Sequence, residues 1–237
     1  MVHTDSDRIP ADRTSSRVNT RNLWPGKALV RTDTAGYPWL MLVAISVSMI
    51  MSVIDATVVN VALSKLEAVF GVGTDSIQWL STGYLLSFGI TLAASGWLAD
   101  RFGYKSIFLL AIALFTLGSF LCSISWNLSS LVFFRIVQGI GGGMMAPVSM
   151  AILLREFPKE KLGIAMAVYS LPTMASAAFG PTLGGWLIDS ASWQMIFDIN
   201  IPIGIAGFAA SYVVLRPYPT DDTKRFDLLG FGSLCIA

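Results

Sequence analysis

Six long apolar segments, separated by short polar connections, constrain this chain more than any other feature of its sequence. They lie at about 38–63, 77–99, 106–124, 129–154, 162–188 and 194–215. Their lengths suit the roughly 20 residues that a helix needs to cross the apolar part of a bilayer. Lipid offers an open backbone no hydrogen-bonding partner, and the segments do not alternate as the strands of a barrel would. The sequence therefore predicts an all-α membrane protein with six transmembrane helices.

The segments outside these spans divide the chain into three parts. Residues 1–36 are polar and have no apolar period, so we expect a disordered cytoplasmic tail. Residues 37–216 are expected to form the six-helix transmembrane bundle. Residues 217–237 are interpreted as a cytoplasmic linker and the truncated start of a seventh span, which begins near Phe226 and stops at Ala237, well short of a crossing.

The placement of the basic residues predicts the orientation of the bundle. Of the 16 Lys and Arg residues, 14 lie before the first span or in the connections that follow the second, fourth and sixth spans. Lys65 alone lies at the opposite side, and Arg135 lies inside the fourth span. Because Lys and Arg are enriched in cytoplasmic loops of membrane proteins, we expect a multi-pass protein with a cytoplasmic N-terminus.

The composition argues against several other classes of protein. Charged residues make up only 13% of the chain, about half of their share in soluble domains. The single histidine, His3, lies in the polar tail, and Cys122 and Cys235 lie in apolar segments, so the bundle lacks the usual general base and metal ligands. No uniformly basic face indicates nucleic-acid binding. We expect no enzyme activity, no metal and no cofactor.

Two charged residues are predicted to lie inside the membrane, where a charge is costly and usually functional. Asp55 lies in the first span and Arg135 in the fourth, at similar depths in the outer part of the bundle. If they pair, the affinity of the carboxyl for a proton depends on whether the two helices are close or apart, which is what proton coupling requires. A static structural ion pair is the alternative.

Glycines and a proline mark the fourth and fifth spans. Arg135 shares one helical face with the polar and small residues at i+3, i+4 and i+7, namely Gln138, Gly139 and Gly142. The fifth span carries Gly180, Pro181, Gly184 and Gly185. Small residues let helices approach closely, and proline breaks a backbone hydrogen bond. Simple helix packing explains both sets, whereas a hinge or a seal against leakage is the functional interpretation of the second.

Several segments carry a resemblance to a known family. They are Asp55–Leu63 in span 1, Gly96–Lys105 after span 2, Arg135–Gly141 in span 4, Gly180–Gly185 in span 5, Trp193–Gly204 at span 6 and Arg225–Gly230 before span 7. In this order they resemble the signatures of the major facilitator superfamily, and within it those of the fourteen-span drug–proton antiporters of the EmrB/QacA type. The short connection after span 6 also fits the fourteen-span class. Ser64, Tyr104 and Ser176 depart from the usual residues of these signatures.

The resemblance implies the N-terminal bundle of a major facilitator fold, belonging to an exporter in a bacterial inner membrane. Such a protein exchanges protons for hydrophobic or amphipathic small molecules, with the proton gradient as its energy source. Asp55 and Arg135 would take part in proton coupling, and the span 5 motif would form the seal. The cytoplasmic gate would comprise Gly96, Asp100, Arg101, Gly103 and Lys105.

The same resemblance implies certain partners and leaves two alternatives open. The partners would be the lipid bilayer, a small-molecule substrate, and either the missing C-terminal half or a periplasmic adaptor. An uptake symporter of the same fold is one alternative to export. A truncated remnant that does not transport is the other.

Overall fold

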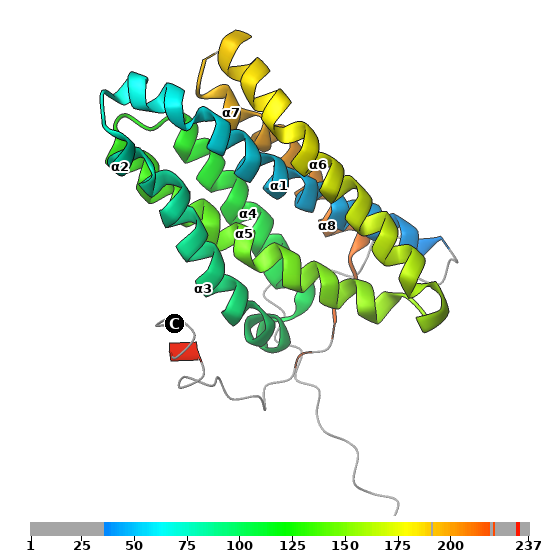
Figure 1. Cartoon of the computed structure of the whole chain (residues 1–237). Helices are drawn as coiled ribbons and strands as arrows, with labels where there is room; N and C mark the ends of the chain where they lie inside the picture. Colours follow the sequence, from blue (N-terminus) through cyan, green and yellow to red (C-terminus); the bar gives the residue numbers. More distant parts are fainter. Residues whose placement is uncertain (1–35, 191, 219, 221–230, 233–237) are drawn as a thin grey trace, which may run out of the picture.

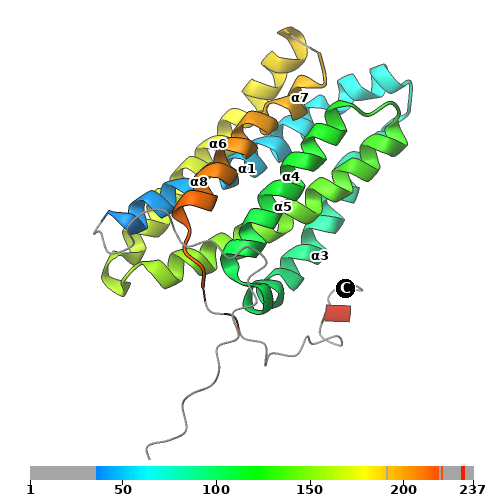
Figure 2. The same cartoon turned by 180° about the vertical axis from the view of Figure 1, so that it is seen from behind.

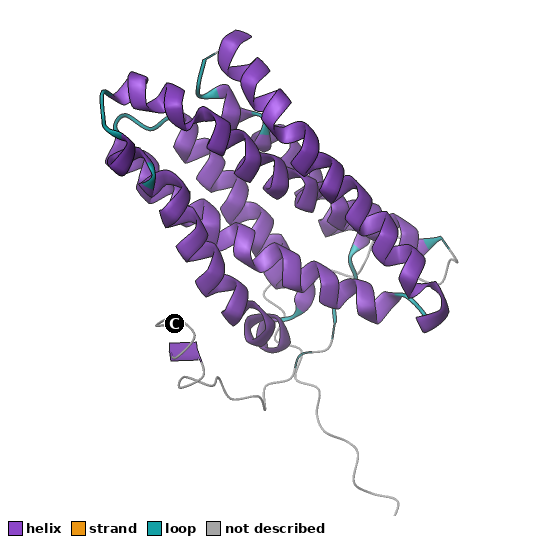
Figure 3. Cartoon of the chain, viewed as in Figure 1, coloured by secondary structure: helices purple, strands orange, loops and turns teal. Residues whose placement is uncertain are grey.

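The computed structural model of the chain describes residues 36–190, 192–218, 220 and 231–232, and within them every regular element is a helix (Figure 1 and Figure 3). The long helices are α1 (Tyr37–Phe70), α3 (Trp79–Phe102), α4 (Tyr104–Ser123), α5 (Leu128–Glu156), α6 (Leu162–Ser190) and α8 (Asn200–Val214). Short helical turns are α2 (Thr74–Ile77), η1 (Lys159–Lys161) and α7 (Met195–Asp198). The predicted all-α fold with six principal helices is confirmed.

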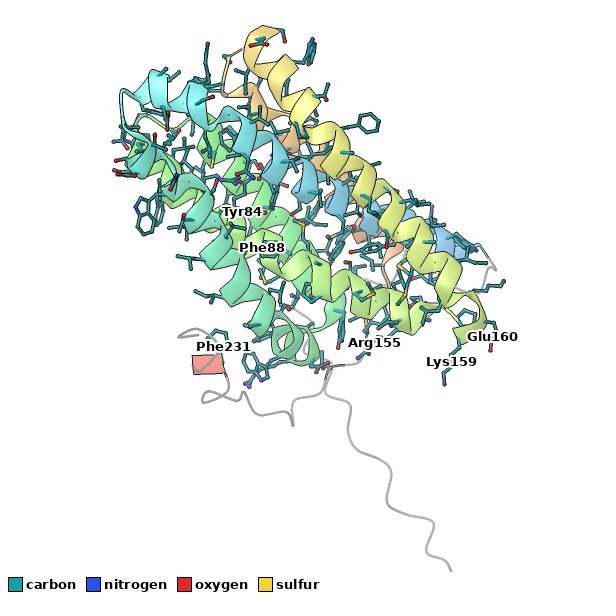
Figure 4. All side chains as sticks on the ribbon, in the orientation of Figure 1. Tyr84, Phe88, Arg155, Lys159, Glu160 and Phe231 are labelled. Atoms are coloured by element: carbon teal, nitrogen blue, oxygen red, sulfur yellow. The ribbon has the colours of Figure 1, made fainter. Side chains whose placement is uncertain are left out.

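Successive long helices run in opposite directions along a single bundle, as the two opposite views show (Figure 1 and Figure 2). The start of α1, the turn from α3 to α4, the connection from α5 to α6 and the end of α8 therefore meet at one end. Arg101, Lys105, Arg155 and Lys159 all belong to that end, and Figure 4 shows Arg155 and Lys159 there. The charge bias predicts that this end faces the cytoplasm, and that orientation stays a prediction.

Five stretches are long and apolar enough to cross a membrane within the described ranges: Tyr37–Phe70, Tyr104–Ser123, Leu128–Glu156, Lys159–Ser190 and Met195–Val214. Helix α3, which covers all but the first two residues of the predicted span at 77–99, is not among them. Its serines, threonines and glycines lower its hydropathy, although it has 24 residues and packs along α5. The polar composition of α3 suits a helix that faces other helices as well as lipid.

Helix α1 is longer than the apolar segment that predicted it. The expected end was at about residue 63, whereas the helix continues to Phe70. Lys65 and Glu67 end the apolar run but are compatible with a helix that emerges into water. Gly71, in the left-handed region at φ +62°, then ends the helix, because a residue without a Cβ atom adopts that conformation at little cost.

The buried core consists of two apolar clusters with a polar layer between them. One cluster includes Met51 of α1 and Met145 of α5, and the other includes Val58 of α1 and Leu131 of α5. Asp55 lies between the α1 members of the two clusters. Charged and amide groups are thus enclosed above and below by side chains that exclude water, so their interactions are stronger than they would be at a surface.

Two expected parts of the chain fall almost wholly outside the described residues. These are the N-terminal tail at 1–36 and the start of the seventh span near Phe226, of which only Phe231 and Gly232 are described, both helical. His3 and Cys235 also lie outside. The division of the chain into tail, bundle and linker therefore stays a prediction.

Candidate functional site

The polar layer gathers side chains from four helices around a single carboxylate. Asp55 comes from α1, Ser119 from α4, Arg135 and Gln138 from α5, and Asn200 from the first residue of α8. All five are buried, with exposed fractions of 1% or less. Residues separated by up to 145 positions in the sequence thus meet in the interior of the bundle.

The carboxylate of Asp55 accepts three hydrogen bonds. Arg135 donates from Nη1 to Oδ2 at 2.6 Å, Gln138 donates from Nε2 to Oδ1 at 2.9 Å, and Asn200 donates from Nδ2 to the same oxygen at 2.7 Å. An ionised carboxylate is an acceptor only, so a shell made of donors fits its charged form. The two residues singled out by their charge are therefore in direct contact.

The guanidinium of Arg135 is held by further contacts. It donates from Nη1 to Gln138 Oε1 at 2.6 Å, and its Cζ lies 4.2 Å from the ring centre of Tyr84 on α3 and 5.9 Å from that of Phe197. Gln138 in turn donates from Nε2 to Ser119 Oγ at 2.7 Å. Aromatic faces stabilise a desolvated cation, and both ends of the Gln138 amide are bonded, so its orientation is determined.

This arrangement places an acid where its charge state and the packing of the helices depend on each other. Taking two charges out of water costs several kcal/mol each, which is offset only by close pairing and full hydrogen bonding. While Asp55 is charged, α1, α5 and α8 are drawn together through it. Protonation removes the negative partner of Arg135 and weakens that attraction. The contact between α1 and α5 at this layer therefore depends on the charges of Asp55 and Arg135.

The glycines of α5 serve close contact with neighbouring helices. A Cβ atom on Gly139 would lie 2.5 Å from the carbonyl oxygen of Tyr84, and one on Gly142 would lie 2.9 Å from its hydroxyl. Gly141, by contrast, faces α4, where a Cβ atom would lie 2.5 Å from the amide nitrogen of Phe115. The small residues thus bring Tyr84 onto Arg135, which is the packing explanation rather than a substrate passage.

The span 5 motif divides between two faces of α6. Gly180 contacts Thr57 and Gly184 contacts Val58, both on α1 within one turn of Asp55. Pro181 is exposed, and a Cβ atom on Gly185 would have no other atom within 4 Å. Two members of the motif therefore bring α6 against α1 beside the buried carboxylate, and the other two face away from that contact.

The contact at Gly180 leads to a matched test. We expect Gly180→Val to force α6 away from α1 and to lower the stability of the bundle by about 1–3 kcal/mol, because its Cβ atom would overlap the Thr57 side chain. Gly185→Val places the same side chain in open space and should leave the stability close to that of the native protein. Thermal unfolding of the two variants in detergent checks this. Equal losses would contradict the packing role of Gly180.

The predicted gate residues form links at the basic end of the bundle. Tyr104 donates from Oη to Asp100 Oδ1 at 2.5 Å. Arg155 Nη2 lies 3.9 Å from the same oxygen. Lys105 is buried and donates from Nζ to the carbonyl oxygen of Tyr212 at 2.8 Å, which ties α4 to the end of α8.

The remaining gate residues shape the turn between α3 and α4. The guanidinium of Arg101 lies 5.3 Å from the ring centre of Trp97. Gly103 has φ +90° and allows α4 to begin directly after α3 ends. A Cβ atom on Gly96 would meet no other atom within 4 Å, so close packing does not account for that glycine.

A further link at the same end joins α5 to the segment after α8. Glu156 accepts hydrogen bonds from Arg216 Nε at 2.7 Å and from Tyr218 Oη at 2.6 Å. Burial, followed by the bond to Glu156, raises the pKa of Tyr218 above its ordinary value. This tyrosine is therefore a neutral donor at any physiological pH.

Sequence reasoning missed two members of the polar layer, Ser119 and Asn200, and the aromatic contact of Tyr84 with Arg135. Asp198, two residues before Asn200, is the acidic side chain nearest to it in the sequence. In the structure Asp198 accepts a hydrogen bond from Ser123 at 2.5 Å, outside the layer. The signal for Asn200 was its amide side chain near the start of an otherwise apolar helix, since buried amides are almost always hydrogen-bonded. A search limited to charged residues does not detect an uncharged amide.

Among the described residues, no group of three or more His, Cys, Asp or Glu side chains could hold a metal ion.

Comparison with known sequences gives consistent matches. The model of the Major Facilitator Superfamily matches residues 45–232. A "Putative multidrug resistance protein MdtD" of Serratia proteamaculans is 41% identical over 203 residues, which are 86% of this chain and 42% of that protein. A "Multidrug resistance protein B homolog" of Mycobacterium tuberculosis is 40% identical over 181 residues, 76% of this chain and 34% of that protein. The chain thus spans less than half the length of these relatives.

Two solved structures share the fold. A bacterial homologue of the human lysosomal transporter Spinster, in an inward-facing and unoccupied conformation, has a TM-score of 0.62 at 18% identity and covers 82% of this chain and 47% of its own. The inward-open xylose transporter XylE from E. coli has a TM-score of 0.64 at 17% identity and covers 76% and 48%. At these identities the likeness is one of fold alone.

Proposed function

We propose, from the premise that this chain belongs to the major facilitator superfamily, that it is the N-terminal bundle of a proton-coupled exporter of hydrophobic or amphipathic small molecules. The observation that carries the proposal is the fully buried Asp55, paired with Arg135 in the interior of the bundle. Intramembrane ionisable residues mark proton relays and substrate pathways in transporters. The relatives whose printed names denote multidrug resistance support export rather than uptake.

The proton would act by changing how strongly the helices hold each other. With Asp55 charged, Arg135 bridges α1 and α5. With Asp55 protonated, Arg135 loses its counter-charge, and the bundle can take up a second arrangement. Exchange follows if the substrate binds better to one arrangement and the proton to the other, since a ligand shifts an equilibrium only by its differential affinity. The proton gradient supplies the energy, and no cofactor enters this cycle.

The surface of α6 supports a second bundle as the partner of this one. Its apolar side chains are left uncovered, Phe179 at 70% and Met174 at 69% exposed. Only 17% of its most apolar stretch is buried within the chain, against 61% for α1. We propose that the C-terminal half packs along this side of α6, with the substrate between the halves. We further propose that the basic end of the bundle faces the cytoplasm. We also propose that a periplasmic adaptor can join the exporter on the other side of the membrane.

Substrate-induced proton movement tests export directly. The complete gene product is reconstituted in everted vesicles with an acidic interior, and a fluorescent lipophilic cation is added outside. Exchange should raise the internal pH as the cation enters, and vesicles without the protein should show neither change. A fall in internal pH on addition of the probe would instead identify a symporter. Absence of any coupled pH change, for this cation and for a neutral dye, would overturn the proposal.

A further inference from the structure

The amide of Asn200 is bonded at one end only. Its Nδ2 donates to Asp55 at 2.7 Å, yet its Oδ1, equally buried, has no hydrogen-bond partner among the described residues. Arg135 Nε, also buried beside Asp55, likewise lacks a hydrogen-bond partner among them, but it is a donor. A buried amide oxygen without a partner is costly and calls for an explanation. Gln138, by contrast, has both ends of its amide bonded. Asn200 is thus a second amide at the site, with one end in use and the other free.

The chemistry of the carboxyl explains what the free end can do. A charged carboxylate needs donors, whereas a protonated one carries an O–H that needs an acceptor. Arg135 has no acceptor, and the Oε1 of Gln138 already accepts from Arg135. Asn200 Oδ1 is a buried acceptor on the residue next to this carboxyl that no donor in the described residues uses. Rotation about the terminal torsion of asparagine, which is broad and roughly two-fold, exchanges the positions of Nδ2 and Oδ1.

We propose that Asn200 is the positioning residue that partners Asp55 in both protonation states by reversing its side-chain amide. In the charged state Nδ2 donates to the carboxylate, as observed. When a proton arrives at Asp55, the amide turns, and the new O–H donates to Asn200 Oδ1. No bond other than the O–H forms, and no group is oxidised or reduced. This inference rests on the proposed role of Asp55 as the coupling acid.

The consequence is that protonation acts on one helix contact and spares another. Asn200 keeps α8 attached to α1 whether Asp55 is charged or neutral. The link through Arg135 between α1 and α5 depends on charge and is the one that weakens. Proton binding therefore weakens the contact between α1 and α5, whereas α8 stays in contact with α1 as the bundle rearranges.

Few other groups can influence this titration. The titratable and charged groups that face Asp55 from the surrounding helices are Arg135 on α5, Tyr84 on α3 and Cys122 on α4. Helix α6 contributes the Gly180 contact with Thr57, and α8 contributes the uncharged amide of Asn200 itself. A change of pH dependence in a variant of Asn200 therefore reports on its hydrogen bonds to Asp55.

Infrared pH-difference spectra of the purified complete gene product test the inference without any transport. The acid carbonyl band of Asp55 is the one absent from Asp55→Asn. In Asn200→Leu, whose side chain neither donates nor accepts, that band should move to higher wavenumber because the acid O–H has lost its acceptor. It should also appear at a pH higher by roughly half to one unit, since a hydrogen bond to a charged group is the stronger of the two that are lost.

A second variant separates hydrogen bonding from fit. Asn200→Thr has nearly the same volume, and its hydroxyl both donates and accepts, so its band should lie closer to that of the native protein than to that of Asn200→Leu. If Asn200→Leu does not purify as folded protein, Asn200→Ala replaces it with the same expectation. The pH profile of efflux should shift in the same direction as the band.

The outcomes are distinguishable from failure of the proposed function. If the spectrum of Asp55→Asn keeps every titrating acid band of the native protein, Asp55 does not exchange protons, and the proposed function itself is wrong. If that band exists but its position and pH dependence are the same in Asn200→Leu, only the role of Asn200 is overturned. A band in Asn200→Thr identical to that in Asn200→Leu would likewise contradict the hydrogen-bonding role.

Discussion

Replacing Asp55 by asparagine is expected to reduce proton-driven efflux by the complete gene product to the background of cells without it. Asparagine has the same shape but carries no proton that can be exchanged, so the charge-dependent contact with Arg135 is lost in every step of the cycle. The measurement is efflux of a fluorescent lipophilic cation from energised cells that lack their own pumps. Transport down a concentration gradient, without proton movement, is the part of the activity that can survive.

The control for this variant is Asp75→Asn, which makes the same chemical change on the exposed turn α2. It should leave efflux within the range of the native protein at equal membrane abundance. Native efflux in Asp55→Asn would remove the carboxyl from its proposed role and leave Asp55 and Arg135 as a structural ion pair. A loss in both variants would show that the assay responds to negative charge in general rather than to the buried site.

The second large effect is expected for Arg135→Met, which should lower the stability of the folded protein by about 3–5 kcal/mol. Methionine fills much of the space of the arginine but leaves Asp55 as a buried charge without its partner, 0% exposed. Thermal unfolding in detergent, followed by tryptophan fluorescence, measures the loss. The double variant that adds Asp55→Asn should recover part of it, because no unpaired charge remains.

Arg155→Met is the matched control, since the side chain of Arg155 is 41% exposed and lies 3.9 Å from Asp100. Exposed pairs contribute about 0–1 kcal/mol, so its unfolding temperature should change little. Equal losses in the two single variants would contradict the distinction between buried and exposed pairs. Additive losses in the double variant of Asp55 and Arg135 would show that the two side chains do not interact energetically.

A chain of this kind carries strong sequence signals for its helices and for its buried charges. The apolar segments predicted the helices because lipid permits no other backbone for them, and the fold class is confirmed. Asp55 and Arg135 were found because a charge in an apolar run is rare. Their separation of 2.6 Å could not be derived, since the facing of α1 and α5 depends on how all the helices pack together.

Uncharged residues carry weaker signals, and these account for what was missed. Serine and threonine are common in membrane helices, so Ser119 had nothing to distinguish it. Asn200 begins α8, separated by one residue from the end of the turn α7, and the face it presents depends on where α8 begins. The glycines were recognised as packing residues, but only the structure shows that Gly139 meets α3 and Gly180 meets α1. A helix face can be predicted from spacing, whereas its partner requires the assembled bundle.

The position of Asp55 along α1 has a mechanical consequence. The helix runs from Tyr37 to Phe70, so the carboxylate divides it into arms of about 27 and 22 Å at 1.5 Å per residue. A tilt of about 10° about that point moves the two ends by about 4 to 5 Å in opposite directions. The carboxylate itself stays in place during such a tilt. A single site near the middle of α1 is therefore positioned so that a change in its contacts can accompany movement at both ends of the helix.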